Sequence, residues 1–217
     1  MSNHSHHELA SPLTRSARPA ALNPRKSPRQ SRATSTVAII LEGAARVLEE
    51  SGLRAYSTNA VANRAGVSVG SVYQYFPAKE AITRALIQRE TGALLAEVKS
   101  LAAVNSPRPA LEAVIDACVA HQLRRPALAR ILDLEEARLP LGDDVADLGR
   151  ALATALHQIL LRGGLRDEDA TLVVAADLLA IIKGIVDAAG QRGETDAAAL
   201  SRRVRRAVFG FLPAEFY

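Results

Sequence analysis

Residues 57–79 of the chain read STNAVANRAGVSVGSVYQYFPAK. Ser57 is a residue type that caps helices, whereas Gly66 and Pro77 are residue types that end them. The segment therefore predicts two short helices, from Ser57 to Gly66 and from Ser68 to about residue 76. Two short helices joined by a tight turn that contains glycine form the helix-turn-helix unit that binds DNA.

The apolar positions of this segment predict a small core between the two helices. Ala62 is small where the helices cross, and Gly66 can adopt the positive φ that the turn requires. Val72 points back at the first helix, and Val67 and Phe76 complete the core.

The opposite face of the second helix carries the residues that can meet DNA. Gly70 and Gln74 point most nearly away from the small core. The flanks of that face carry Ser71, Tyr73 and Tyr75. A glycine on the outer face lets the helix approach DNA closely, and a glutamine can bond adenine bidentately. We therefore expect Gln74 to read a base.

The segment resembles the DNA-binding part of the tetracycline-repressor (TetR) family. The resemblance covers about residues 35–86 and is strongest in the string VSVGSVYQYFPAK at residues 67–79. The order Gly-Ser-aliphatic-Tyr-x-aromatic-Phe-x-x-Lys is specific to that family. It implies a nine-helix homodimer whose first three helices read the major groove and whose last two helices dimerise. It also implies a cavity in the larger domain that binds an effector.

The same resemblance implies roles for single residues. Thr58, with Asn59 beside it, corresponds to a phosphate anchor, and Lys79 corresponds to a further phosphate contact. The base-facing start of the recognition helix corresponds to Ser68, Val69, Gly70 and Ser71. Its phosphate-contacting aromatics correspond to Tyr73 and Tyr75. Val69 either touches a thymine methyl group or only fills space.

Basic residues gather in the first part of the chain. Residues 1–90 hold 12 Lys and Arg against 6 Asp and Glu, whereas residues 91–217 hold 15 against 17. A basic first part indicates contact with a polyanion. Residues 1–34 have few large apolar side chains and should form a disordered basic tail. At its end, Arg29 and Arg32 either reach a minor groove or a phosphate, or only keep the tail soluble.

Helical spacing of apolar residues continues to the end of the chain and predicts an all-α fold of about nine helices without a sheet. We expect a helix-turn-helix domain over residues 35–80 and a larger effector-binding and dimerisation domain over residues 81–217. The expected helices cover residues 35–52, 57–66, 68–76, 78–101, 107–125, 126–138, 143–161, 167–189 and 195–211.

The helix expected over residues 167–189 is apolar nearly all round. Such a helix must be buried on more than one side, which predicts a homodimer through this helix and the last one. Two identical reading helices require a palindromic or near-palindromic operator. We expect repression of transcription by occlusion of a promoter.

The middle of the chain contains no aromatic residue between Pro77 and Val208, the span that supplies nearly every helix able to line a cavity. We therefore expect a small apolar effector, held by aliphatic walls and few polar groups. Its expected contacts are Cys118, His121, Arg124, His157 and Asp177. Further polar candidates are Glu135, Glu136, Arg138 and Lys183, and the alternative for each polar candidate is a surface or helix-capping role. The alternative is a protein of the same fold without an effector, which organises the chromosome or recruits another protein.

Other classes of protein lack support in the sequence. No Ser-His-Asp arrangement, metal-spaced His/Cys set or phosphate-binding glycine loop occurs, so we expect no catalysis, cofactor or metal. The single cysteine, Cys118, excludes an internal disulfide and suits a reducing cytoplasm. The most apolar run, residues 172–182, is too short to span a bilayer, and no secretory signal is visible. We expect a cytoplasmic protein without a membrane partner.

Overall fold

The computed structural model describes residues 28–139, 143–213 and 216. Within these ranges every element is helical and no residue lies in a strand, which confirms the expected all-α fold. The helices are α1 Pro28–Ala55, α2 Thr58–Ala65, α3 Val69–Tyr75, α4 Lys79–Ala102, α5 Pro107–Arg124, α6 Pro126–Arg138, α7 Asp143–Arg162, α8 Glu168–Gln191 and α9 Ala197–Phe211. No helix in the described ranges is both long and apolar enough to cross a membrane.

The first helix begins earlier than its apolar spacing indicated. α1 starts at Pro28, whereas we expected order to begin near Ser35. The expectation of disorder is therefore wrong for residues 28–34, and Arg29 and Arg32 lie on α1. Residues 28–34 carry too few apolar side chains to register as a periodic helix, although proline suits a first helical turn. The rest of the expected tail, residues 1–27, lies outside the described residues.

The regular part of α1 ends at the glycine that was expected to stop it. Gly52 has φ 65° and ψ −173°, a backbone conformation outside the helical region. Residues with a side chain rarely adopt this positive φ, so glycine at this position lets the chain turn toward α2.

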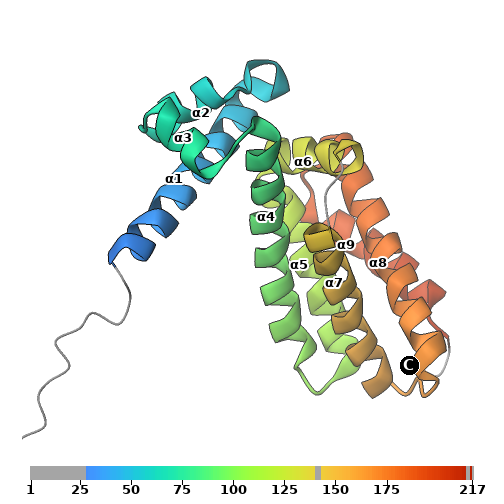
Figure 1. The fold of residues 1–217 in the computed structure, drawn as a ribbon. Coiled ribbons are helices and arrows are strands. Elements are labelled where there is room, and N and C mark those ends of the chain that lie inside the picture. Colours follow the sequence, from blue (N-terminus) through green and yellow to red (C-terminus); the bar gives the residue numbers. More distant parts are fainter. Residues whose placement is uncertain (1–27, 140–142, 214–215, 217) are drawn as a thin grey trace, which may run out of the picture.

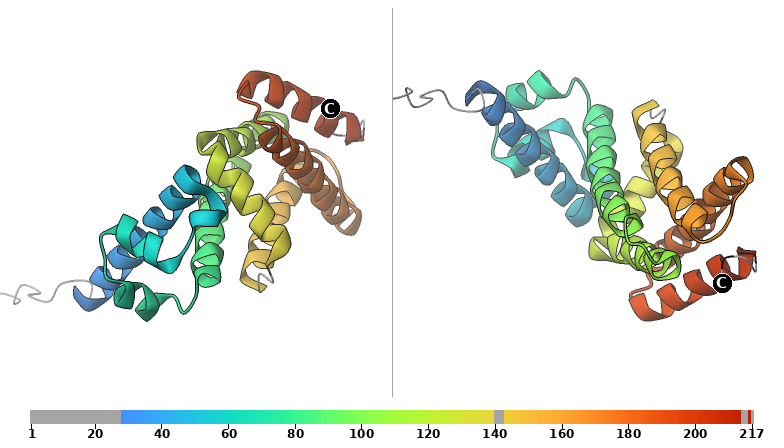
Figure 2. Two further views of the ribbon diagram at one scale, coloured as in Figure 1. Left: turned by 90° about the horizontal axis from the view of Figure 1, so that it is seen from above. Right: turned by 90° about the horizontal axis from the view of Figure 1, so that it is seen from below.

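Helices α1, α2 and α3 form a head, and the remaining helices form a larger body (Figure 1). α4 leads out of the head and runs beside α5 and α7, while α7 lies beside α8. α9 packs against α5 and α8, and the three views agree on this arrangement (Figure 2). The short α6 crosses the end of the body nearest the head and contacts both α1 and α8.

The structure has two apolar clusters, one inside the body and one that joins the head to the body. The body cluster surrounds Ile159 and Leu178, neither of which has solvent exposure. The head cluster surrounds Val61 and continues into the body through Leu132 of α6 and Val145 of α7. Because protein cores are close-packed, a displacement of α6 must also displace its neighbours in the head.

Candidate nucleic-acid interface and effector cavity

The ends of α2 and α3 are set by the residues that the sequence marked as caps. The Ser57 hydroxyl accepts a hydrogen bond from the backbone N–H of Ala60 at 3.2 Å. Gly66 ends α2 in the left-handed conformation, with φ 68° and ψ 31°. The Ser68 hydroxyl accepts from the backbone N–H of Ser71 at 3.0 Å. Local chemistry therefore fixes both helices and the turn between them.

The small core of the helix-turn-helix forms as expected. Ala62 and Val72 have no exposed surface, and Phe76 is 7% exposed. Val67 is half-buried and packs against the same cluster.

A glycine that the sequence did not single out allows α1 to lie directly on α2. A Cβ atom added at Gly43 would lie 2.9 Å from Cβ of Ala65 and 3.0 Å from its backbone nitrogen. Nothing in the local sequence signals this contact, because it arises only where two helices cross.

The outer face of α3 is open to solvent. Gly70 and Gln74 are exposed, and Tyr73 is 53% exposed. The hydroxyl groups of Tyr73 and Thr58 lie 3.2 Å apart, which brings the start of α2 to the edge of that face. Lys79 is exposed at the start of α4. Gly70, Tyr73, Gln74 and Lys79 are thus accessible to a DNA surface, and Thr58 lies half-buried beside them.

The remaining expected DNA contacts have mixed environments. Asn59 and Ser68 are exposed, whereas Ser71 is half-buried and its hydroxyl lies 2.8 Å from that of Ser68. Val69 and Tyr75 are half-buried against the head cluster, so both also contribute to packing. The side chains of Arg29 and Arg32 lie outside the described structure.

The start of α4 is tied to the head by two buried hydroxyl groups that the sequence did not identify. The Tyr56 hydroxyl donates to the carbonyl oxygen of Lys79 at 3.5 Å, and the Thr83 hydroxyl donates to the same oxygen at 3.1 Å. Burial raises the pKa of Tyr56 to about 12, so this phenol remains a hydrogen-bond donor. Lys79 is therefore positioned through its backbone, while its side chain stays free.

An exposed helix that bears Gly70, Tyr73 and Gln74, held by a capped turn to a second helix, has the geometry that enters a major groove. The head is thus that of a helix-turn-helix DNA-binding protein.

A partly open cavity of about 160 Å³ lies in the body between α4, α5, α6, α7 and α8. Its aliphatic lining residues include Ile87, Leu128, Leu152, Leu179 and Ile182. No aromatic side chain of the described residues lines it, which agrees with the expected aliphatic walls. A space of this size accepts a body of about one six-membered ring.

A second hollow, of about 470 Å³, opens beside the head between α1, α4 and α6. Leu53 and Leu134 are its large aliphatic side chains, and both are partly open to solvent. Four of its eight lining residues, Lys79, Glu80, Glu135 and Arg138, carry a charge, so the smaller cavity is the better candidate for the site of an apolar effector.

Three of the five expected effector contacts line the internal cavity, namely Cys118, His121 and Arg124 from the end of α5. His157 and Asp177 do not line it, and Asp177 is exposed on α8, which corrects the expected set. Periodicity does not show which flank of a helix faces a cavity when that helix packs on several sides.

The pKa values of two of these α5 side chains are shifted toward the neutral form. Burial, with a contribution from Glu97, raises the pKa of Cys118 to about 12, so the thiol stays protonated. Burial and the charge of Arg124 lower the pKa of His121, which favours the neutral imidazole.

The wall formed by α6 and α8 is more polar than expected. Lys183 Nζ lies 3.1 Å from Glu136 Oε2 and 3.1 Å from Asp187 Oδ2. Gln122 Nε2 donates to Asp133 Oδ2 at 3.0 Å. The expectation of few polar groups is therefore wrong for this wall, because these side chains come from separate helices and meet only in the folded chain.

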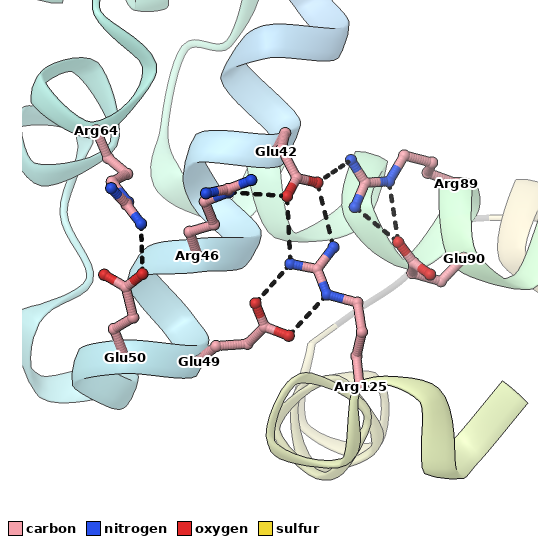
Figure 3. A network of polar contacts seen from close by, with 8 residues as sticks. All are labelled: Glu42, Arg46, Glu49, Glu50, Arg64, Arg89, Glu90 and Arg125. Carbon is pink, nitrogen blue, oxygen red and sulfur yellow. Dashed lines mark hydrogen bonds and ion pairs between the residues drawn. The ribbon is translucent and has the colours of Figure 1, made fainter.

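Arg125, at the junction of α5 and α6, joins the body to the head (Figure 3). Its Nε and Nη2 atoms donate to Glu49 at 2.7 and 2.5 Å, and its Nη1 atom donates to Glu42 at 3.1 Å. Arg89 of α4 lies 3.6 Å from the same Glu42 carboxylate. Because Arg125 also lines the cavity, one side chain touches both the cavity and α1.

Both the helix-turn-helix part and the larger helical part of the chain match models of known protein families. Residues 40–86 match the model for bacterial regulatory proteins of the tetR family. Residues 106–212 match the model for the tetracyclin repressor-like C-terminal domain. The chain belongs to the TetR family, and it is a DNA-binding transcriptional regulator.

Solved structures share this fold. The fatty acid degradation regulator FadR from Bacillus halodurans has a TM-score of 0.68 at 19% identity, over 81% of this chain and 99% of that chain. FadR from Bacillus subtilis in complex with stearoyl-CoA has a TM-score of 0.68 at 21% identity, with the same coverage of 81% and 99%. A TetR regulator from Rhodococcus sp. RHA1 has a TM-score of 0.62 at 25% identity, over 85% and 98%.

One similar protein is a nucleoid occlusion factor, SlmA from Haemophilus ducreyi. The two sequences are 32% identical over 84 residues, which is 38% of this chain. The match spans 42% of the length of that relative.

Proposed function

We propose that the protein is a homodimeric cytoplasmic repressor that occupies a palindromic operator and leaves it when a small effector enters the internal cavity. Arg125 carries this proposal, because it lines the cavity and also binds Glu42 and Glu49 of α1. An occupant that favours another position of the α5–α6 junction changes the position of the head. The loss of DNA affinity cannot exceed the difference between the affinities of the occupant for the DNA-binding position of the head and for the displaced position.

Exposed apolar side chains on adjacent helices support a dimer. Leu172 and Val173 on α8 are 48% and 62% exposed, and Phe211 on α9 is 44% exposed. α8 and α9 also contact each other. A second copy would cover these side chains and place two recognition helices on one face of DNA.

Selection of binding sites from random DNA tests the DNA-binding part of the proposal. We expect an inverted repeat with half-site centres about one DNA turn, roughly 34–36 Å, or more apart. A reporter whose promoter overlaps the selected site should be less active when the protein is present. A strong preference for asymmetric DNA, or higher reporter activity, would contradict the proposal.

A second candidate function is chromosome organisation or protein recruitment without an effector. The identity of 32% with the nucleoid occlusion factor favours it, whereas the internal cavity favours the effector-controlled repressor. Chromatin immunoprecipitation separates the two. A repressor should occupy a few promoters, and a chromosome-organising protein should occupy many dispersed sites.

A further inference from the structure

The α6–α8 wall of the cavity contains more negative than positive side chains. Asp133, Glu136 and Asp187 contribute three carboxylates, and Lys183 contributes one ammonium group. Lys183 already contacts both Glu136 and Asp187 at 3.1 Å. The wall therefore carries an excess of negative charge that its own lysine does not neutralise.

Two arginines and Glu90 of α4 also line the cavity. Arg125 is held by Glu42 and Glu49 outside the cavity. Arg124 is exposed and contacts the Nδ1 atom of His121 at 2.9 Å.

Asp133 is the carboxylate with the weakest compensation. Gln122 donates to its Oδ2 atom, and no ion pair joins Asp133 to a cation of the described residues. Burial raises the pKa of Asp133, the Gln122 hydrogen bond lowers it, the Asp187 carboxylate raises it, the charge of Lys183 lowers it and the Glu136 carboxylate raises it; the net shift is upward. A partly buried carboxylate in this setting is stabilised by an additional positive charge.

We propose that the cavity binds a compact apolar amine in its protonated form, with the ammonium group at Asp133 and Asp187 and the hydrocarbon body against the aliphatic walls. The volume of about 160 Å³ suits a single ring or a short branched chain. The excess of carboxylates disfavours a ligand carboxylate at the same wall. This inference rests on the proposed effector site and names the chemical class of its occupant.

Three probes with one hydrocarbon body test the inference: cyclohexylmethylamine, cyclohexylmethanol and cyclohexanecarboxylate. Each is titrated calorimetrically into the full-length protein without DNA. We expect the amine to bind at least about tenfold more tightly than the alcohol, and the carboxylate to bind most weakly. Carboxylate affinity equal to or above that of the amine overturns the inference, and so does the failure of all three probes to bind.

Asp133→Asn is the decisive variant, because its amide oxygen can still accept the hydrogen bond from Gln122 while the charge is lost. Amine affinity should fall about tenfold or more, and alcohol affinity should stay unchanged. The matched control is Asp147→Asn, which removes the same charge from an exposed residue of α7 that does not line the cavity. The inference is overturned if Asp133→Asn, Asp147→Asn and the unaltered protein all bind the amine with the same affinity.

Two further measurements keep the result interpretable. If Asp133→Asn does not fold, Asp187→Asn removes the second carboxylate, and its amine affinity should fall in the same way. Fluorescence anisotropy on the selected operator then separates this inference from the proposed function. An amine that binds without releasing DNA supports the ligand class and contradicts effector control. A carboxylate that binds more tightly than the amine and releases DNA contradicts the ligand class and supports effector control.

Discussion

At the scale of single residues, the contact of Gly43 with Ala65 makes a direct stability prediction. Gly43→Ala should destabilise the protein by about 1–3 kcal/mol, because the new methyl group meets the backbone of α2. The matched control is Gly92→Ala in α4, where nothing lies within 4 Å of the added atom. That change should stabilise the protein by about 0.5–1 kcal/mol through helix propensity. Urea unfolding of both variants measures the difference, and equal effects would show that the helices do not touch at Gly43.

We expect Gln74 to contact a base and Lys79 to contact a phosphate group. Both side chains are exposed, Gln74 on the outer face of α3 and Lys79 at the start of α4. Gln74→Ala should relax selection at one base position by about 1–3 kcal/mol. Lys79→Ala should weaken binding to all sequences alike and reduce the salt slope by about one unit. Titrations with operator and non-operator DNA at several salt concentrations measure both effects. A change of specificity in the lysine variant alone would reverse the assignment.

At the scale of helices, the contact between Arg125 and Glu49 should couple α1 to the α5–α6 junction. The two side chains are each 25% exposed and paired through two hydrogen bonds. A double-mutant cycle with Arg125→Gln and Glu49→Gln should give a coupling energy of about 1 kcal/mol, near the upper range for accessible pairs. The same cycle for Arg46 and Glu42, which are 54% and 41% exposed, should give about 0.5 kcal/mol or less.

The same pair should transmit the effector signal. Glu49 does not itself line the cavity, so an effector should still bind to the Glu49→Gln variant while it releases operator DNA less completely. Glu50→Gln is the control, because Glu50 pairs with Arg64 inside the head. Operator release measured by anisotropy distinguishes them. Equal loss of release in both variants would show that the head responds without the Arg125 contact.

At the scale of the whole molecule, the proposed dimer depends on the exposed apolar surface of α8 and α9. Val173→Arg should give a monomer at micromolar concentration, because it places a charge on a surface that a second copy covers. Val104→Arg makes the same substitution at an exposed valine in the α4–α5 turn and should leave the dimer intact. Sedimentation velocity checks both. A stable dimer in the α8 variant would require another interface.

The sequence by itself determined the parts of the protein that depend on neighbouring residues. Ser57, Gly66 and Ser68 set the helix-turn-helix through caps and a positive φ, and these effects act within a few positions. Helix spacing gave the all-α fold for the same reason, and it missed the start of α1 only because residues 28–34 lack an apolar stripe.

Only the tertiary structure decided which distant side chains meet. Arg125 binds Glu49 and Glu42 from 76 and 83 positions away, and Gly43 contacts α2 only because two helices cross there. The carboxylates of Asp133 and Asp187 likewise face one cavity from separate helices. Such contacts depend on how helices rotate about their axes and pack, and local propensity does not specify that rotation when a helix is buried on several sides.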